Sequence, residues 1–424
     1  MTPVGDGGPA VRRLAEWDAE RLLAVADEYD TPTYVIDLDR VAANCARLSA
    51  AFPAADVSYA VKAHTGRAVL RRVREAGLGA ECASAGEVER ALAAGFPGDR
   101  IRYTAVNPPG RDLDRVVERW RDDPGLTITV GAADTVDRLR DRGFDGRLCV
   151  RANPGVGAGH HEKVRTGANA KFGIPIERVA DLAASWNGEF DLVGVHAHAG
   201  SGISGEDLSA HRELVSRMGD LAREIESEIG PLEFVDVGGG FGVPYREDDP
   251  SLDLGSVAAA TREALGEVSA SLSVEPGRYV VADAGVLLTR VNTVKQARDA
   301  TVVGVDAGMT TLLRPAMYDA YHAIRNLSAD ANAESEAEAD ARETRPVTVA
   351  GPICESADVL AEQRPLPRPE RGELLAVGNA GAYGYEMSST YNSRPRPAEV
   401  ARSGTTVRLA RQRETIPDIT ELER

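Results

Sequence analysis

The sequence predicts an α/β protein in which a (β/α)8 TIM-like barrel is followed by a C-terminal β-rich domain. Short apolar runs alternate with helical patterns up to about residue 276, and this alternation changes to closely spaced β-runs after Gly277. The chain has 424 residues, of which 43% are hydrophobic. A single barrel takes up about 250 residues, so we expect two domains.

The first part of the chain contains nine β-runs joined by helical patterns, which favours a parallel sheet. These runs are residues 34–37, 57–62, 79–84, 101–104, 127–130, 148–151, 193–198, 234–237 and 272–275. A (β/α)8 barrel has eight strands, so we expect the first run to lie elsewhere. The clearest helix carries Leu208, Leu214, Val215, Met218, Leu221 and Ile225 on one face. We expect that face to pack on the sheet.

The second domain is predicted from β-runs joined by Gly and Pro turns. They are residues 279–282, 286–294, 301–305, 345–350, 373–377 and 405–409. Residues 328–343 mix alanine with carboxylates, which is typical of a solvated loop or a marginal helix. The predicted domains are residues 38–283 for the barrel, and residues 1–37 with 284–424 for a β-rich domain that includes the N-terminal segment.

Charge and composition limit the partners. A formal net charge of −17 opposes binding to nucleic acids and anionic membranes. Apolar runs stay below the roughly 18 residues of a membrane span, so we expect a soluble cytoplasmic protein. The four cysteines form no CxxC pair, which favours free thiols and no metal site. Only four of the 49 basic residues are lysines, which fits either adaptation to high salt or a GC-rich genome.

Lys62 ends an apolar strand in this lysine-poor chain. A partly desolvated lysine is easily held as a neutral amine, fit for a Schiff base. The alternative is an ordinary lysine in water. His196 and His198 alternate along one later strand and form either a site or a core-facing pair. A third metal ligand beside them is not identifiable.

Two turns supply further candidate groups. Consecutive glycines in residues 236–242 suit either a phosphate or a tight turn, and they lack a dinucleotide fingerprint. Glu275 and Arg278 form either a surface ion pair or, for Glu275, a partner for a pyridine nitrogen. Polar groups also recur in the turns at 314–318, 351–358 and 378–383. Together these segments suggest a pyridoxal phosphate site split across two domains.

The order of these segments resembles a known family. The matching segments are residues 59–63, 196–201, 238–240, 275–278, 354–356 and Tyr383. They resemble the fold type III, alanine-racemase-like decarboxylases, which depend on pyridoxal 5'-phosphate. Within that family, residues 314–322, 354–358 and 391–397 look like those of the diaminopimelate decarboxylases. Ornithine decarboxylases would have a shorter acid after the cysteine.

The resemblance implies a role for each matching residue. Lys62 would form the Schiff base, His198 would stack on the pyridine ring, and Glu275 would pair with its nitrogen. The cofactor's phosphate would lie among Ser201, Gly239, Gly240, Gly277, Arg278 and Tyr383. The distal amino-carboxylate end of the substrate would meet Arg278, Arg314, Tyr318, Glu355 and Tyr383.

The implied reaction is decarboxylation of meso-2,6-diaminopimelate to L-lysine and carbon dioxide, the last step of lysine biosynthesis. The family's active sites are shared between the two subunits of a homodimer, so Cys354 of the partner subunit would be the proton donor. Two residues depart from the family pattern: His64 replaces an asparagine, and Glu81 replaces a shorter aspartate.

Two other functions remain open from the sequence. One is decarboxylation of a polyamine precursor such as carboxynorspermidine, or of a basic amino acid. The other is a catalytically inactive binding protein built on the same fold. An inactive relative is expected to lack Lys62 or Cys354, and both residues are present.

Overall fold

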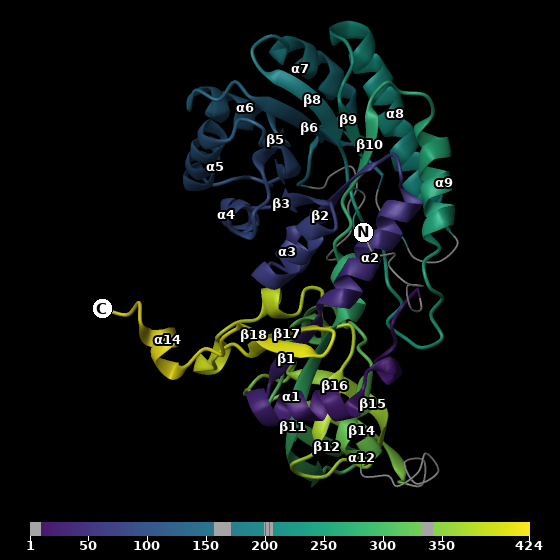
Figure 1. Ribbon diagram of the computed structural model, residues 1–424, viewed down its shortest axis with the longest axis vertical. Helices are drawn as coiled ribbons and strands as arrows, with labels where there is room; N and C mark the ends of the chain where they lie inside the picture. Colours follow the sequence, from purple (N-terminus) through teal and green to yellow (C-terminus); the bar gives the residue numbers. More distant parts are fainter. Residues whose placement is uncertain (1–9, 157–170, 199, 201–202, 204–206, 332–341) are drawn as a thin grey trace. The chain divides into compact units, whose positions relative to one another are not determined.

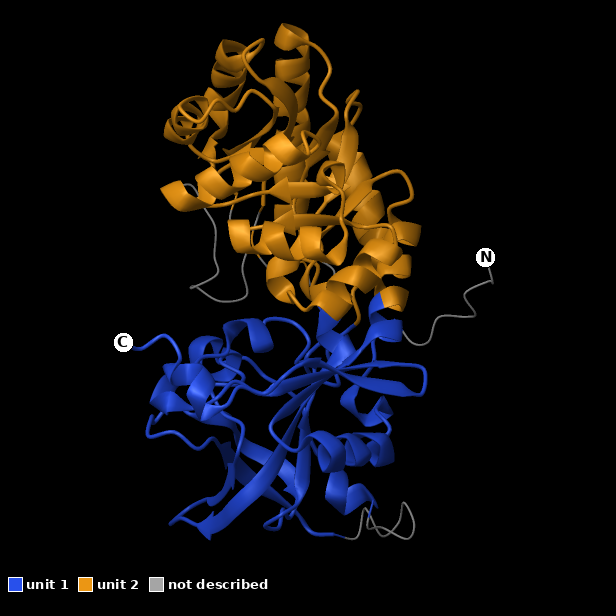
Figure 2. Cartoon of the chain, turned by 60° about the vertical axis from the view of Figure 1, so that its left-hand side comes forward, with its two compact units in different colours: residues 1–41, 243–250, 281–424 blue, residues 42–242, 251–280 orange. Residues whose placement is uncertain are grey.

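The computed structural model describes residues 10–156, 171–198, 200, 203, 207–331 and 342–424. The chain divides into two compact units, coloured separately in Figure 2. Unit 1 consists of residues 1–41, 243–250 and 281–424, and unit 2 consists of residues 42–242 and 251–280. Segment 243–250 is thus grouped with unit 1, although it lies between two parts of unit 2 in the sequence.

Unit 2 contains a closed parallel barrel of eight strands (Figure 1). In order around the barrel these are β2 (Asp56–Ala60), β3 (Gly79–Cys82), β4 (Ile101–Tyr103), β5 (Thr127–Val130), β6 (Arg147–Asn153), β8 (Asp191–His196), β9 (Phe234–Asp236) and β10 (Ser271–Val274). Pairing of β10 with β2 closes the ring. The two-residue β7 (Ile174–Pro175) pairs with β6 beside it. Eight of the nine predicted runs form this barrel.

Helices alternate with the barrel strands along the chain. They are α2 (Leu38–Ala51), α3 (Arg67–Glu75), α4 (Ala85–Ala94), α5 (Gly110–Asp122), α6 (Ala133–Arg140), α7 (Val179–Trp186), α8 (Ser209–Ile229) and α9 (Leu254–Leu265). The predicted apolar stripe lies on α8, where Leu214, Met218 and Ile225 are almost fully buried. Leu208 precedes the helix as its N-cap. In the part of the chain that the structure describes, no helix is long and apolar enough to cross a bilayer.

Unit 1 contains a mixed sheet. Its strands are β1 (Thr33–Asp37), β11 (Gly285–Gln296), β12 (Thr301–Val305), β13 (Ile324–Asn326), β14 (Thr344–Ala350), β15 (Val359–Pro367), β16 (Leu374–Val377), β17 (Ala398–Ser403) and β18 (Thr406–Arg411). β1 runs antiparallel to β11 and parallel to β17. The first predicted run therefore lies outside the barrel, as expected.

Alternation along β1 supplies two hydrophobic clusters. Tyr34 packs with Leu287 and Leu375, whereas Val35 packs with Val286 and helix α1 (Ala19–Tyr29). Successive strand residues point to opposite faces of a sheet, so one strand contributes to both clusters. Three further short helices of the chain are α11 (Arg314–Tyr318), α12 (Leu327–Ala331) and α14 (Ile416–Thr420).

One predicted strand is wrong. Residues 279–282 form helix α10 (Arg278–Val281) and the start of a 3-10 turn. Val280 and Val281 are fully buried there, and a short apolar run alone cannot distinguish a buried strand from a buried helix. β15 was not predicted because Pro365 and Pro367 interrupt it. Proline is tolerated there because β15 lies at the end of the sheet order.

Candidate active site

Lys62 and Glu81 come from neighbouring strands of the barrel. Lys62 lies in a 3-10 helix, Val61–Ala63, that directly follows β2, and Glu81 lies on β3. The Nζ of Lys62 hydrogen-bonds with Oε2 of Glu81. The Glu81 side chain is 3% exposed, whereas that of Lys62 is 39% exposed. The amine is therefore anchored to the barrel wall and remains accessible at the carboxyl ends of the strands, where barrel enzymes build their sites.

Glu275 and His196 form a buried pair across β9, which lies between their strands. Oε2 of Glu275, directly after β10, lies 3.1 Å from Nε2 of His196 at the end of β8. The two side chains are 5% and 2% exposed. Oε1 of Glu275 is also buried, and it has no hydrogen-bond partner among the described residues. A buried carboxylate oxygen without a partner is costly, so this atom is an acceptor suited to a bound group.

Burial controls the protonation of this cluster. It raises the pKa of Glu275, an effect opposed by the positive charges of Lys62, Arg102 and Arg151. Burial lowers the pKa of His196 to about 3, so the ring is neutral at pH 7. A neutral ring that donates from Nε2 to Glu275 places no second proton on Nδ1. That atom has no partner within the described part of the chain.

Asp236 lies at the end of β9, the strand between β8 and β10. Its Oδ2 accepts a hydrogen bond from Nη1 of Arg102 at 2.7 Å, and its Oδ1 accepts one from the Gly238 N–H at 2.8 Å. Burial raises the pKa of Asp236 to about 6. Ligand atoms of His196, Asp236 and Glu275 lie within 4.8 Å of one another, a spacing that a metal ion could bridge. The carboxylate of Asp236 already has the Arg102 guanidinium as its counter-charge.

The glycine segment after β9 lies against His198 and Glu275. The Gly239 N–H donates to Nδ1 of His198 at 3.1 Å, and a Cβ on Gly239 would lie 2.1 Å from the Glu275 carbonyl oxygen. Gly238 and Gly240 adopt positive φ angles of 73° and 97°, which glycine tolerates best. Desolvation holds the pKa of His198 well below its usual value.

The remaining predicted groups of the barrel follow β10. Gly277 packs so closely that an added Cβ would lie 3.1 Å from Cβ of Ala60, and half-buried Arg278 begins α10. Ser201 lies outside the described residues. His64 is buried, and its Nδ1 accepts a hydrogen bond from the Gly66 N–H at 3.1 Å. This histidine therefore shapes the turn that leads into α3.

Unit 1 carries the other predicted residues. Arg314 and Tyr318 are the two ends of α11. Arg314 is 3% exposed, and its Nη1 lies 2.8 Å from Nε2 of His322. Tyr318 is half-buried. Tyr383 is half-buried as well and adopts a positive φ of 55°, an uncommon conformation for a bulky residue.

Cys354 and Glu355 lie in an exposed loop between β14 and β15. Sγ and the backbone N–H of Cys354 both approach Oδ1 of Asn392 at 3.2 Å. Buried Asp358 holds the same loop, because its carboxylate accepts from the N–H groups of Ile353 at 2.9 Å and Met309 at 2.6 Å. The loop thus presents the thiol outward from a fixed backbone.

The family assignment follows from a comparison with known proteins. Residues 38–282 match the family model described as the pyridoxal binding domain of pyridoxal-dependent decarboxylases. The chain belongs to this family. The matched region contains the barrel strands and the candidate residues Lys62, His198 and Glu275.

Relatives over nearly the whole length are diaminopimelate decarboxylases. The protein of that name from Methanothermobacter thermautotrophicus is 42% identical over 411 residues, covering 93% of this chain and 92% of the relative. That from Escherichia coli K12 is 36% identical and covers 96% of each chain. The crystal structure of the Helicobacter pylori enzyme complexed with L-lysine is 31% identical with a TM-score of 0.85, covering 96% of this chain and 99% of that one. The chain is thus an enzyme, a decarboxylase of this family.

Several residues of this decarboxylase's site were not predicted from the sequence. Arg151, Asp236 and Arg102 are buried or nearly buried charges on barrel strands, and each directly interrupts a β-run. A charge within an apolar strand of a predicted barrel is the signal that would have identified them. His322, Asn392 and Asp358 lie in segments that resemble the family, but no role was predicted for them, because their contacts reach other segments of the chain.

Proposed function

We propose that this decarboxylase converts meso-2,6-diaminopimelate into L-lysine and carbon dioxide, with pyridoxal phosphate as its cofactor. The observation that carries the choice of substrate is the match to diaminopimelate decarboxylases over 93% or more of the chain. Structures of two such relatives are complexed with L-lysine. Lysine synthesis is the corresponding biological role.

The residues at the end of the barrel fit the cofactor. The buried Oε1 of Glu275 is suited to accept a hydrogen bond from a pyridinium N–H. The Lys62 amine is accessible for an aldehyde carbon. Gly239 and Gly240 lack side chains, so this turn can approach a phosphate closely, although the Gly239 N–H itself donates to His198. When bound, the cofactor withdraws electrons from the bond between Cα and the departing carboxylate.

Each barrel residue then has a definite task. Lys62 holds the cofactor through Nζ and yields that position to the substrate amine. Glu275 keeps a proton on the ring nitrogen, and His196 donates to the second oxygen of the same carboxylate. His198 packs on the cofactor ring. Its Nδ1 accepts a hydrogen bond from the Gly239 N–H, which holds the imidazole in place. Ser201, Gly277, Arg278 and Tyr383 complete the phosphate site in this proposal.

Residues of unit 1, with Arg278, recognise the distal end of the substrate in this proposal. Arg314 binds the distal carboxylate, because a planar guanidinium can donate to both oxygens. Glu355 pairs with the distal ammonium, and Tyr318 and Tyr383 supply hydroxyl groups. Ornithine lacks a distal carboxylate, so Arg314 favours diaminopimelate over ornithine.

Cys354 of the partner subunit donates the proton that replaces the lost carboxylate. The contact of its Sγ with the Asn392 amide oxygen requires a proton on sulfur, which is the form a proton donor needs. We propose a homodimer with shared sites from the family resemblance. A monomer is then expected to be inactive.

Product identification tests the function directly. Purified protein with pyridoxal phosphate should release carbon dioxide from meso-2,6-diaminopimelate and form L-lysine, detected by mass spectrometry. Ornithine, arginine, lysine and carboxynorspermidine form the comparison panel. Turnover of one of these substrates, with none of diaminopimelate, would overturn the proposal.

Substitution of the amine tests the role of Lys62. Lys62→Ala should remove the visible absorption of bound cofactor, because that absorption requires a bond between its aldehyde and a protein amine. Turnover should also fall below detection. Lys171→Ala, which alters another lysine of unit 2, is the matched control. An unchanged spectrum in Lys62→Ala would reject this role.

Substitution of the thiol separates cofactor binding from proton transfer. Cys354→Ala should leave the visible absorption intact and lower kcat by about 100-fold or more, as expected for loss of a general acid. Absorption spectra and steady-state kinetics on the same preparation measure both effects. Full activity would exclude Cys354 as the proton donor.

A further inference from the structure

Arg314 is the first member of a buried hydrogen-bonded chain in unit 1. Its Nη1 lies 2.8 Å from Nε2 of His322, and Nδ1 of His322 lies 2.8 Å from the carbonyl oxygen of Gly378. His322 has no exposed surface, and Arg314 is 3% exposed. The chain therefore links the start of α11 to the residue that follows β16.

The protonation of His322 follows from its two partners. A guanidinium only donates hydrogen bonds, and a carbonyl oxygen only accepts them. The ring must therefore carry its proton on Nδ1 and offer the Nε2 lone pair to Arg314. In this form His322 is neutral, so it directs one N–H of Arg314 without cancelling the charge of the guanidinium.

The Tyr245 ring makes a second contact with Arg314 that carries no negative charge. Cζ of Arg314 lies 4.8 Å from the ring centroid of Tyr245, and Tyr245 meets His322 edge-on with centroids 5.3 Å apart. A cation above an aromatic face is attracted without being neutralised. Both contacts therefore hold the guanidinium in place, and neither of them brings a negative charge to it.

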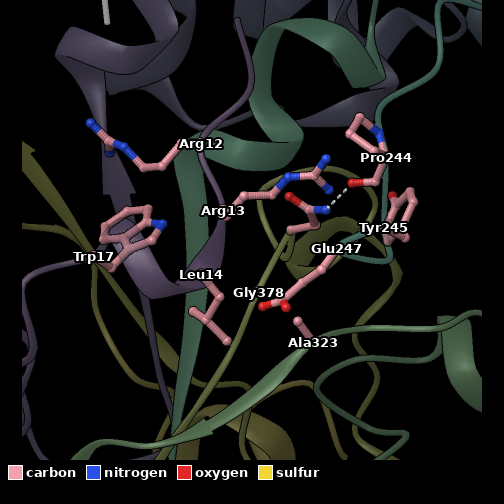
Figure 3. A pocket seen from close by; sticks show the side chains of 10 residues that line it. Arg12, Arg13, Leu14, Trp17, Pro244, Tyr245, Glu247, Ala323 and Gly378 are labelled. Atoms are coloured by element: carbon pink, nitrogen blue, oxygen red, sulfur yellow. Dashed lines mark hydrogen bonds between the residues drawn. The ribbon is translucent and has the colours of Figure 1, made fainter. Parts of the chain in front are cut away.

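The far end of the chain is itself fixed. Figure 3 shows Pro244, Tyr245, Ala323 and Gly378 lining one small cavity of unit 1. The Gly378 N–H donates to the Ala323 carbonyl at 2.9 Å. Asn379 donates from Nδ2 to the Pro244 carbonyl at 2.9 Å, the dashed line in Figure 3. The segment that carries Tyr245 is thereby tied to the turn that carries Gly378.

The backbone of His322 has its own support. Nη1 of Arg364, on β15, donates to the His322 carbonyl at 2.6 Å. Nη1 of Arg13 donates to the Arg246 carbonyl at 2.6 Å, next to Tyr245 in the sequence. The two segments that carry His322 and Tyr245 are thus fixed by further hydrogen bonds within unit 1. These two residues therefore limit rotation of the Arg314 guanidinium plane.

We propose that His322 is a positioning residue that selects substrates with a distal carboxylate, by orienting Arg314 through a neutral contact that adds no negative charge. The inference rests on the proposed function, in which Arg314 binds that carboxylate. A bidentate contact depends on the orientation of the guanidinium plane. A carboxylate in place of His322 would satisfy the same N–H but would compete with the substrate for the charge.

Three variants of His322 separate orientation from charge. His322→Gln keeps a neutral acceptor for Arg314 and a donor for Gly378. His322→Glu has nearly the same shape but neutralises Arg314. His322→Phe removes both hydrogen bonds and keeps most of the volume. His211→Gln, which alters another buried histidine, is the matched control. Tm and cofactor absorption report whether each variant is folded and loaded.

The expected result is a change in KM with little change in kcat. His322→Glu and His322→Phe should raise the KM for meso-2,6-diaminopimelate by about 10- to 100-fold, the usual effect of losing a charge-assisted hydrogen bond. The kcat should change by less than about 5-fold. His322→Gln and His211→Gln should stay within about 3-fold of the wild type in both constants.

Inhibitors show whether the effect belongs to the carboxylate. L-lysine retains the distal carboxylate of the substrate, whereas cadaverine has the same carbon chain and no carboxylate. Inhibition by L-lysine should weaken in parallel with the KM in His322→Glu, and inhibition by cadaverine should not change. A structural defect would weaken both inhibitors alike.

The outcomes distinguish this inference from the proposed function. If the wild type does not decarboxylate meso-2,6-diaminopimelate, the proposed function fails. If the wild type is active and His322→Glu matches His322→Gln in KM and L-lysine inhibition, only the positioning role is overturned. The Glu and Gln pair decides this even if His322→Phe does not fold.

Discussion

At the scale of single residues, the two carboxylate oxygens of Glu275 have different surroundings. One oxygen meets neutral His196, and the other is buried with no partner among the described residues. Burial raises the pKa of Glu275, and the positive charges of Lys62, Arg102 and Arg151 oppose that rise. These neighbouring positive charges favour the ionised form of Glu275. A residue that pairs with a pyridinium nitrogen has to be ionised.

Glu275→Gln tests this point. An amide has no charge to keep a proton on the ring nitrogen, so kcat should fall by about 100-fold or more while the fold persists. Steady-state kinetics and the cofactor absorption spectrum measure the effect. Glu233→Gln is the control, because Glu233 directly precedes β9 at the opposite end of the barrel strands. Equal activity of the two variants would contradict the assigned role.

The sequence indicated where several candidate residues would lie, and their roles stay predictions. Lys62 and Glu275 stand at the ends of apolar runs, and residues at such strand ends converge in a barrel. Contacts that join distant segments could not be predicted from the sequence. His322 reaches the Gly378 carbonyl 56 residues away, and no local pattern encodes that pairing. Whether Oε1 of Glu275 finds a partner among the described residues likewise depends on the tertiary fold around it.

At the scale of elements, α8 and α9 are joined by a buried polar contact within their apolar interface. Nε2 of His211 on α8 lies 2.7 Å from Oγ1 of Thr261 on α9. The Thr261 hydroxyl donates to the Val257 carbonyl at 2.7 Å, so it accepts from His211. Burial lowers the pKa of His211 to about 4.

His211 therefore makes the barrel sensitive to acid. The unfolded chain binds a proton at His211 below its ordinary pKa of about 6.5, and the folded chain does so only near pH 4. Stability should fall as the pH drops through this interval, by on the order of 3 kcal/mol. Above pH 7 the group contributes no pH dependence.

His211→Gln tests the effect, because glutamine can still donate to Thr261 and does not titrate. Urea unfolding between pH 4 and 8 should show a shallower loss of stability at low pH in the variant than in the wild type. The other buried groups, such as Asp236, are common to both proteins and cancel in the comparison. Parallel curves would contradict the prediction.

Prediction of the elements succeeded where the signal was local. The barrel strands from β2 to β10 were expected from apolar runs at regular spacing. Prediction failed at α10, where Val280 and Val281 favour a strand by propensity but are buried in a helix. It failed also at β17 between β1 and β18, where the charged Glu399 and Arg402 interrupt the apolar pattern.

At the scale of the whole molecule, the proposed sites combine Lys62 of one subunit with Cys354 of the other. Each subunit then contributes to two sites, as in a two-fold dimer with an isologous interface. A shared site therefore predicts that two inactive variants can complement each other, whereas a site within one chain does not.

Mixing Lys62→Ala with Cys354→Ala should restore activity. Each mixed dimer has one site with both residues intact and one site that lacks both. If subunits exchange at random, half of the dimers are mixed, and about a quarter of the wild-type activity should return. Activity measured before and after subunit exchange tests this. If activity stays at the level of the separate variants, the shared site is excluded.

The position of β1 in its sheet has a consequence for biosynthesis. All eight barrel strands precede residue 275, whereas β1 pairs with β17, whose first residue is Ala398. A ribosome therefore completes every barrel strand long before the parallel neighbour of β1 exists. During that interval the nascent chain carries β1 with an open hydrogen-bonding edge, a known risk for association between chains. Chaperone demand during translation should accordingly come from the N-terminal strand, which must wait for nearly the whole chain.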